Sequence, residues 1–272
     1  MSMNLENYIE KQFHTKDFNL EKTDKGISNQ NYILTIQNKK YMVRVPKKNQ
    51  EALGLQHEHE KEIIDKVNNL DVPTYLFDTE SGIKITEYIE NTKTFDECKD
   101  KDKFSRCAKL MKSLHEKEAP LFIFNPFGKI EFYKSQIQNP IVSFPNEDHF
   151  LEALKKEYKP NTLCHNDFVQ GNILYTNEKD YLIDYEYAAK NDYRFDIASF
   201  FSENNIHYID QRDQFYQAYF EGEIDPMIDV QVQAFERMED ILWGYWANML
   251  YEKRQEQIYL DIAKEKEKHY RG

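Results

Sequence analysis

The feature that most constrains the fold of this chain is the segment 163–187, which joins a polar loop to a short apolar hairpin. An apolar stretch ends at Cys164, and the residues from there to Asn172 have the composition of a loop. Two short apolar runs on either side of the turn-forming residues 177–180 predict a β-hairpin. We therefore expect Asn172 and Asp184 at the two chain ends of one hairpin, Asn172 before its first strand and Asp184 after its second.

These residue types at this spacing match the needs of phosphoryl transfer. Asp167 offers a carboxylate that can accept a proton from a hydroxyl, and Asn172 and Asp184 offer oxygen ligands for a metal ion. Transfer from Mg-ATP depends mostly on positioning and charge neutralisation, so such groups must converge on one point. The alternative is an ordinary turn with a carboxylate at a strand end. The combination of His165 with all three residues favours the phosphoryl-transfer site.

Protein kinases carry a related pattern, in which His-Arg-Asp is followed by Asn and then by Asp-Phe-Gly. In this chain Asp184 is followed by Tyr185 and Glu186, so the Phe-Gly pair is absent. The chain is therefore not expected to be an ordinary protein kinase.

The segment 163–203 resembles the choline/ethanolamine kinases and their relatives, the aminoglycoside phosphotransferases, which share a protein-kinase-like fold. The resemblance extends over about residues 20 to 260, and among bacterial members it is nearest to choline kinases that feed phosphocholine into surface polymers. The matching residues are His165–Asp167 with Asn172, Ile183–Ala188, Phe195–Ala198 with Glu203, and Trp243–Trp246.

By this resemblance Asp167 is the catalytic base, and Asn172 and Asp184 hold Mg²⁺ as the companion of ATP. Glu186, Trp243 and Trp246 would form the choline pocket. Asp196 would brace the catalytic loop, and Glu203 would either do the same or line the substrate site. The chain departs from some eukaryotic members in lacking a glycine before Phe195-Asp196 and in being shorter, so details of the pocket and of dimerisation do not carry over.

The fold class expected from the pattern and the resemblance is α+β, with the two lobes of a protein-kinase-like fold. Residues 1–90 would form a small nucleotide-binding lobe with an N-terminal helix, a hairpin, a second helix and a second hairpin. Residues 91–272 would form a larger, mostly helical lobe for catalysis and substrate binding.

In the first region, apolar residues alternate along 32–36 and 41–45, which predicts a hairpin. The alternation places Arg44 on the face opposite Val43 and Val45, where a cation can reach nucleotide phosphates. The resemblance matches this strand to the one that carries the phosphate-binding cation. The alternative is an arginine that lies along the sheet surface.

Other nucleotide-binding residues are expected around this hairpin. The preceding loop, 25–31, has one glycine and the hydrogen-bonding side chains Ser28, Asn29 and Asn31, which could cover phosphates or simply form a turn. A helix is expected over 53–67. By the resemblance, its Glu60 pairs with Arg44, although Glu58 and Glu62 are alternatives. The strand 82–89 resembles the hinge, where the backbone of Glu87 to Ile89 would meet adenine.

Two helices are expected in the second region. One covers 95–115 and ends near His115, a residue expected to be structural. The other carries an apolar stripe from Phe235 to Met249, with Trp243 and Trp246 three residues apart on a neighbouring face. Two indole rings in one cavity suit a quaternary ammonium, at about 0.5 to 2 kcal/mol for each contact. Core packing is the alternative for the tryptophans, and Tyr187 and Tyr193 are possible further walls.

Composition agrees with this interpretation. The 272 residues, 40% of them apolar, are enough for a large core or two lobes. A formal charge of −12 opposes nucleic acid and favours a cationic substrate. The three cysteines show no metal-ligand spacing, and there is no signal segment or membrane-spanning stretch, so we expect a cytoplasmic protein without a membrane partner.

The function expected from the sequence is transfer of the γ-phosphate of Mg-ATP to choline. A kinase for another alcohol or cation (ethanolamine, thiamine, an aminoglycoside or a sugar) remains an alternative, because the catalytic segment is shared among such enzymes. A non-catalytic nucleotide-binding protein of the same fold is a further alternative. The sequence leaves the oligomeric state open.

Overall fold

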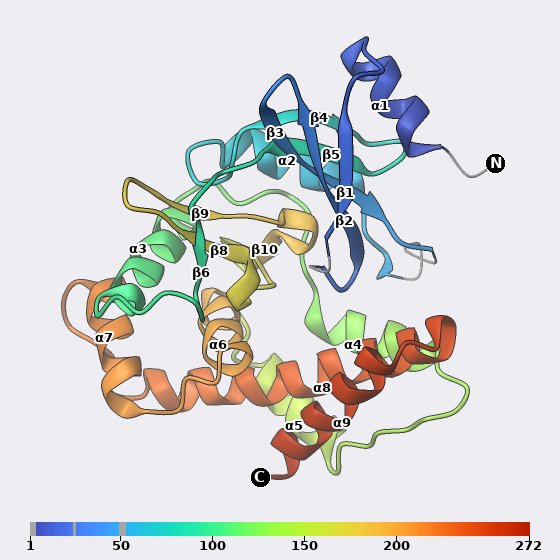
Figure 1. Cartoon of the computed structure of the whole chain (residues 1–272). Helices are drawn as coiled ribbons and strands as arrows, with labels where there is room; N and C mark the ends of the chain where they lie inside the picture. The colour runs from blue at the N-terminus through green and yellow to red at the C-terminus, as the bar shows by residue number, and fades with distance from the viewer. Residues whose placement is uncertain (1–3, 24–25, 49–52) are drawn as a thin grey trace. The chain divides into compact units, whose positions relative to one another are not determined.

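The structure is a computed structural model, and it describes residues 4–23, 26–48 and 53–272. The chain forms two compact units, one of Met1–His57 with Val72–Glu90 and one of Glu58–Asp71 with Asn91–Gly272. The first unit is built on an antiparallel sheet and the second is mostly helical, which confirms the expected α+β class (Figure 1). The assignment of separate nucleotide-binding and catalytic roles to residues 1–90 and 91–272 stays a prediction.

The first unit is a five-stranded sheet, and helix α1 (Leu5–Phe13) packs against its hydrophobic core. The strand order is β1-β2-β3-β5-β4, with every pair antiparallel. Alternate residues such as Leu34, Val43 and Ile85 are fully buried, and Ile9 of α1 packs with them. The strands are β1 (Asn19–Lys22), β2 (Asn29–Ile36), β3 (Lys39–Pro46), β4 (Thr74–Asp78) and β5 (Ile83–Glu87).

The expected hairpin is confirmed as β2 and β3. Gln37 and Asn38 at its tip both have positive φ, the backbone of a tight two-residue turn that suits the twist of the strands. Pairing in the hairpin sets Asn31 opposite Arg44. Asn29 and Asn31, expected in a loop, lie in β2, while Lys25 of that loop lies outside the described residues.

The second unit contains two small sheets among its helices: β6-β8-β9 and β10-β7. The long helix α8 has its apolar stripe buried, as expected, and packs on α9, α6 and α4. The elements of the second unit are α2 (His57–Lys66), β6 (Lys93–Thr94), α3 (Lys103–His115), α4 (Pro126–Ser135), α5 (Glu147–Lys155), β7 (Thr162–Cys164), η2 (Gln170–Asn172), β8 (Ile173–Tyr175), β9 (Asp180–Leu182), η3 (Tyr185–Tyr187), β10 (Ala189–Asn191), α6 (Tyr193–Glu203), α7 (Ile209–Phe220), α8 (Ile228–Arg254) and α9 (Gln257–Arg271).

Two helix starts were predicted too early. Helix α2 begins at His57 and not at residue 53. Helix α3 begins at Lys103 and not at residue 95, because the backbone N–H of Thr94 donates to Glu97 in a tight turn. That turn buries Phe95 against Phe104 of α3. The apolar pattern did not predict α9.

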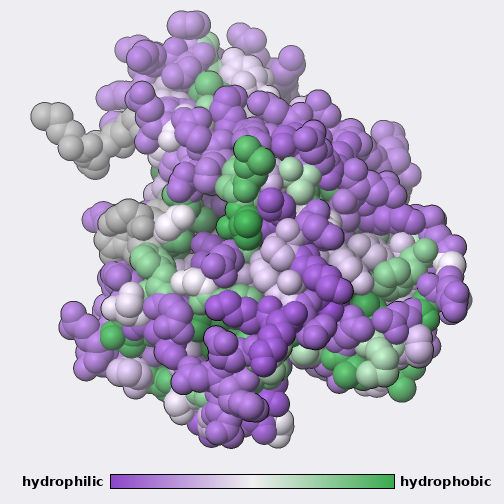
Figure 2. Space-filling model, turned by 180° about the vertical axis from the view of Figure 1, so that it is seen from behind, coloured by the Kyte–Doolittle hydropathy of each residue, from purple (hydrophilic) through white to green (hydrophobic). Residues whose placement is uncertain are grey.

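Charged and polar side chains cover most of the face in Figure 2, in keeping with a chain in which 31% of residues are charged. All three cysteines are free thiols in buried positions. Among the described residues, no helix has both the length and the apolar character needed to cross a bilayer.

Candidate active site

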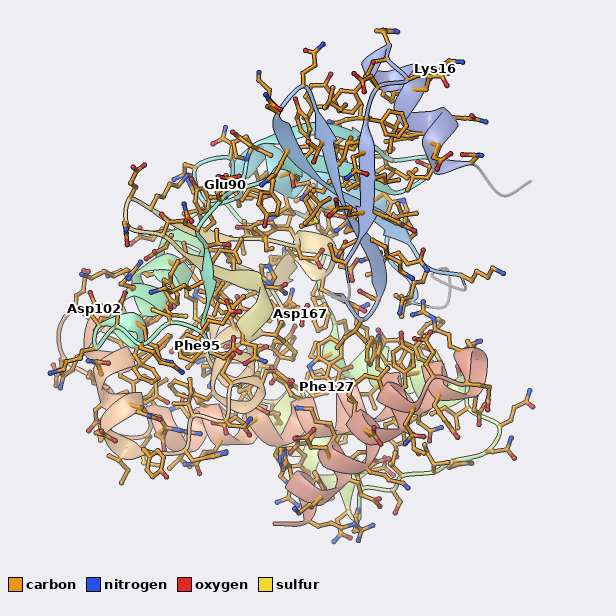
Figure 3. All side chains as sticks on the ribbon, in the orientation of Figure 1. Lys16, Glu90, Phe95, Asp102, Phe127 and Asp167 are labelled. Carbon is orange, nitrogen blue, oxygen red and sulfur yellow. The ribbon has the colours of Figure 1, made fainter. Side chains whose placement is uncertain are left out.

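The predicted catalytic residues lie in the second unit, in the loop between β7 and β8 and just after β9. Figure 3 labels Asp167, which lies in that loop. The side-chain amide of Asn172 donates to both the backbone carbonyl of Asp167 (3.0 Å) and its carboxylate (3.1 Å). These bonds fix the Asp167 rotamer and leave the amide oxygen of Asn172 for another partner. Asp167 is only partly exposed.

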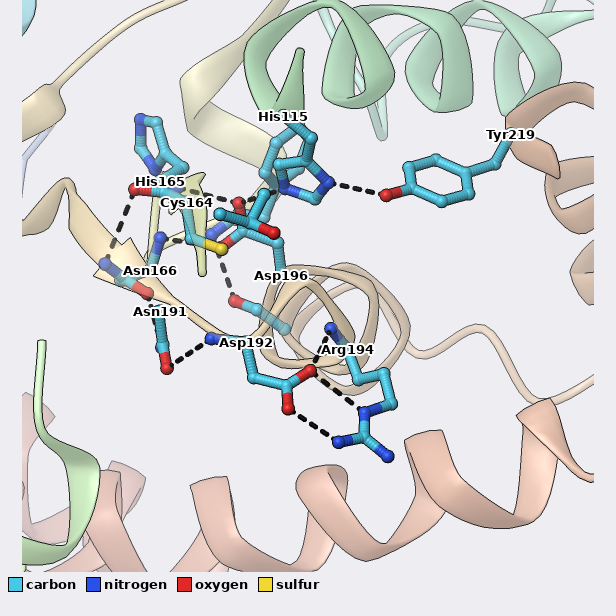
Figure 4. A network of polar contacts seen from close by, with 12 residues as sticks. His115, Cys164, His165, Asn166, Asn191, Asp192, Arg194, Asp196 and Tyr219 are labelled. Carbon is cyan, nitrogen blue, oxygen red and sulfur yellow. Dashed lines mark hydrogen bonds and ion pairs between the residues drawn. The ribbon is translucent and has the colours of Figure 1, made fainter. Parts of the chain in front are cut away.

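The buried carboxylate of Asp196 holds the start of this loop. Its two oxygens accept the backbone N–H groups of His165 and Asn166, each at 2.7 Å (Figure 4). Further along α6, the Ser199 hydroxyl accepts the N–H of Phe168. Helix α6 therefore anchors the backbone on both sides of Asp167, and the expectation that Asp196 braces the loop is confirmed.

We predict that Asp196→Ala lowers the free energy of unfolding by about 3 to 5 kcal/mol, because it leaves two backbone N–H groups and the His115 ring without their buried acceptor. Thermal unfolding followed by circular dichroism measures the change. Asp148→Ala is the matched control, since that carboxylate is 88% exposed and its loss should have little effect. Equal melting temperatures for the two variants would contradict the bracing role.

A second layer supports Asp196. His115, at the end of α3, contacts the Asp196 carboxylate through Nε2 (3.0 Å) and the Tyr219 hydroxyl through Nδ1 (2.7 Å), as Figure 4 shows. His115, Cys164 and Asp196 lie close enough to hold a metal ion. However, burial raises the pKa of the Cys164 thiol well above its ordinary value, and the other two groups are used in hydrogen bonds. The group is a structural network, as expected for His115.

The other side of the loop is fixed by Asn166, whose φ of 66° is in the left-handed region that asparagine tolerates. Its amide donates to the backbone carbonyl of Tyr187 (2.9 Å), and its oxygen accepts from Asn191 (2.7 Å). The loop that carries Asp167 is therefore tied directly to the segment that follows Asp184.

Asp184 follows β9, and its φ of 70° is also left-handed. The N–H of Ile183 donates to the Asn172 carbonyl (2.9 Å), which brings the two predicted metal ligands to one end of the hairpin. His165 Nε2 contacts the Ile183 carbonyl (3.0 Å), and burial lowers the pKa of His165. A neutral His165 that donates from Nε2 therefore holds the backbone next to Asp184.

The site has an excess of negative charge. Burial, and then the neighbouring carboxylates of Asp184, Glu186 and Glu203, raise the pKa of Asp167 well above its ordinary value. Asn172 and Asp184 offer the amide and carboxylate oxygens that Mg²⁺ prefers, and a divalent cation would offset the repulsion among the acids. The donor set fits magnesium.

An aromatic cluster adjoins this site. The Tyr187 ring lies 5.5 Å from that of Trp243, and the Tyr187 hydroxyl accepts from Trp246 Nε1 (3.1 Å). The two indoles are 5.9 Å apart at nearly a right angle. All three side chains and Glu186 are buried, and the charge of Glu186 contributes to a raised pKa of Tyr187. The predicted pocket residues are thus brought together, except for Tyr193.

Tyr193, at the start of α6, lies in a different aromatic group. Its ring stacks on Tyr219 (6.2 Å) and meets Phe220 edge-on (6.4 Å). Among the described residues its ring contacts are with α7 and not with Tyr187. A substrate role for Tyr193 stays a prediction without support from this placement.

The predicted nucleotide-binding residues fall mostly in the first unit, where they occupy β2, β3, β5 and their flanking turns. Arg44 is buried, and its guanidinium lies 5.7 Å from the Phe77 ring. Glu60 is buried on α2, whereas Glu58 and Glu62 are exposed, so burial singles out the predicted glutamate. Their nucleotide roles, with those of Ser28, Asn29, Asn31, Glu87 and Ile89, stay predictions.

The sequence reasoning missed several side chains that support the site. Asn204 donates to the Phe168 carbonyl (3.1 Å), and buried Lys266 of α9 forms an ion pair with Glu203. Ser199 could have been found, since it lies three residues after Asp196 on one face of a helix. Lys266 gave no signal, because its contact spans 63 residues in a helix that was not predicted.

Comparisons with known proteins show what this chain is similar to in sequence and in fold. A family model described as choline/ethanolamine kinase matches residues 20–223. The protein LicA of Haemophilus influenzae is 24% identical over 247 residues, which cover 82% of this chain and 71% of LicA. The crystal structure of the choline kinase LicA from Streptococcus pneumoniae has a TM-score of 0.81 at 27% identity, and the match covers 98% of this chain and 97% of that one. A structure of LicA in complex with AMP has a TM-score of 0.77 at 25% identity, over 97% of each chain.

Proposed function

This chain belongs to the choline/ethanolamine kinase family, and we propose that within it the chain transfers the γ-phosphate of Mg-ATP to the hydroxyl of choline, giving phosphocholine. The family resemblance drawn from residues 163–203 is thus confirmed. Membership makes the chain a phosphotransferase that acts on an alcohol. The choice of choline among the family's alcohols rests on the second unit.

Tyr187 is the residue that carries this choice. Its backbone carbonyl is held by Asn166, next to Asp167, and its ring and hydroxyl contact Trp243 and Trp246. One residue thus joins the phosphoryl-transfer loop to a cluster of aromatic rings near Glu186. Ring faces and a carboxylate can hold a quaternary ammonium, which cannot donate a hydrogen bond. A substrate with its cation at the rings and its hydroxyl at Asp167 has the chemistry of choline.

The proposed roles follow from the contacts. Asp167, oriented by Asn172, would accept the proton of the attacking hydroxyl. The amide oxygen of Asn172 and the carboxylate of Asp184 would hold Mg²⁺. When bound, that ion supplies charge neutralisation at the phosphates.

The residues that would bind the nucleotide belong to the first unit and to α2. Arg44 of β3 would bind phosphates, and Glu60 of α2 keeps the supporting role that the resemblance gives it. Ser28, Asn29 and Asn31 would cover them, and the backbone of Glu87 to Ile89 would meet adenine. The complex of LicA with AMP supports a nucleotide as the second substrate.

The experiment that tests the proposal is ADP release by the purified protein with Mg-ATP, with choline and without any acceptor. Release that depends on choline, with phosphocholine recovered, is the expected result. Ethanolamine, thiamine, an aminoglycoside and a sugar alcohol are run in parallel. Release that responds to one of these and not to choline would overturn the choline assignment while leaving the kinase intact. Nucleotide binding without turnover on any acceptor would indicate a non-catalytic protein.

We predict that Trp243→Leu raises the KM for choline about tenfold with little change in kcat, because a cation–π contact worth about 1.4 kcal/mol is lost while an apolar side chain remains. Trp243→Phe is the matched control, since it keeps an aromatic face. Steady-state kinetics with choline and with ATP separate the effects, and the KM for ATP should stay constant. An unchanged KM for choline in Trp243→Leu would remove the basis for the aromatic pocket.

A further inference from the structure

Lys129 of α4 places its ammonium among three aromatic rings. Its Nζ lies 5.1 Å from the ring centroid of Phe124, 5.7 Å from that of Tyr187 and 5.9 Å from that of Tyr133. Phe124 and Tyr187 meet edge-on at 6.4 Å. This arrangement is an aromatic cage with a cation in it, of the kind that recognises quaternary ammonium groups.

The cage holds the ammonium without a carboxylate partner. No ion pair or hydrogen bond joins the Lys129 side chain to any residue in the described part of the chain. Burial alone lowers the pKa of Lys129, to about 8. The Tyr133 hydroxyl in the same cage is fully buried, and it too lacks a hydrogen-bond partner among the described residues. A partly buried cation and a fully buried, unpaired hydroxyl in one place leave recognition capacity for a ligand.

The cage and the proposed choline pocket share a wall. Tyr187 contacts Lys129 and also contacts Trp243 and Trp246. Burial raises the pKa of both Tyr133 and Tyr187, and the charge of Glu186 adds to the shift of each. The ammonium of Lys129 therefore lies against the same aromatic group that would receive the cation of the acceptor.

We propose that Lys129 is a specificity-determining residue that competes with the acceptor: its ammonium occupies the ring faces of Phe124, Tyr133 and Tyr187 and opposes the binding of a cationic head until it loses its proton. The inference rests on the proposed function, because it concerns the same pocket. It predicts that affinity for a cationic alcohol rises as the pH passes through the range in which Lys129 becomes neutral.

The second lysine of α4 is engaged away from the cage. Lys134 of α4 pairs with Glu147 of α5 (2.6 Å), and Glu147 also accepts from the Tyr245 hydroxyl of α8. Glu186 of η3, Tyr133 and Tyr187 are the ionisable groups at the cage itself, and burial raises the pKa of both tyrosines. Between about pH 7 and pH 9.5, Lys129 is thus the cage residue expected to change charge.

Two variants isolate this charge. Lys129→Met keeps an unbranched side chain of similar length without charge, and Lys129→Arg keeps a charge that does not titrate in this range. In the wild type, the KM for choline should fall about tenfold between about pH 7 and pH 9.5. The Met variant should show the low KM at both pH values, and the Arg variant the high one. An acceptor in which tert-butyl replaces the trimethylammonium group is uncharged, so its KM should not follow this pattern.

Binding of tetramethylammonium, measured by calorimetry at both pH values, repeats the comparison without turnover. The Met variant is expected to bind tetramethylammonium more tightly than the Arg variant. The affinity of the wild type should match that of the Arg variant at the lower pH and that of the Met variant at the higher pH. Equal affinities in all three proteins at both pH values would overturn the inference, while choline-dependent ADP release would leave the proposed function standing. Loss of choline-dependent release in the wild type would instead count against the proposed function, and the calorimetric comparison would still decide the role of Lys129.

Discussion

Asp167→Asn is expected to lower kcat for choline about a thousandfold, the scale set by loss of a positioned general base. Asparagine has the same shape and offers an oxygen to the Asn172 amide that now donates to the Asp167 carboxylate. The backbone anchors at His165, Asn166 and Phe168 do not involve the Asp167 side chain. The loop should therefore keep its conformation, and the loss should fall on chemistry and not on folding.

The measurement is choline-dependent ADP release under saturating Mg-ATP, with circular dichroism to check the fold. Glu178→Gln is a matched control, because this carboxylate is exposed at the tip of the β8–β9 hairpin and close in sequence to the site. It should retain wild-type kcat. Near-normal turnover by Asp167→Asn would show that another group takes the proton, and the assigned base would be wrong.

The site residues that sequence reasoning found share a local origin. Asp167, Asn172 and Asp184 lie within 18 residues on one loop and hairpin, so their spacing determines their geometry. The hairpin of β2 and β3 could also be predicted from the sequence, because the two apolar runs and the polar turn between them are local features that need no distant partner. Such features can be predicted from the sequence because they follow from short-range periodicity and turn chemistry.

The supports of the site could not be predicted in the same way. Tyr219 reaches His115 across 104 residues, and Lys266 reaches Glu203 across 63. Lys129 gave no signal at all, because a lysine on a helix is usually a solvated residue, and only the fold brings the rings of Phe124 and Tyr187 around it. The predicted start of α3 was wrong because a local turn at Thr94 competed with the apolar pattern.

Asp184→Asn is expected to lower kcat about a hundredfold or more and to raise the Mg²⁺ concentration needed for half-maximal rate, because it removes a negative charge from the proposed metal site. Asparagine is the right substitution, since the φ of 70° at this position is left-handed and asparagine tolerates it, whereas alanine would add backbone strain. The Ile183 bond to Asn172 is made by backbone and should persist.

The two aspartates can be told apart by titrating Mg²⁺ at fixed ATP and choline. Asp184→Asn should shift the magnesium dependence to higher concentration, whereas Asp167→Asn should reduce the maximal rate with the dependence unchanged, because a base is not a metal ligand. Glu178→Gln again serves as the control and should match the wild type in both respects. If Asp184→Asn and Asp167→Asn respond identically to magnesium, the division of roles is wrong, and the carboxylates act as one charged group. A wild-type magnesium dependence in Asp184→Asn would place the metal on other oxygens of the site.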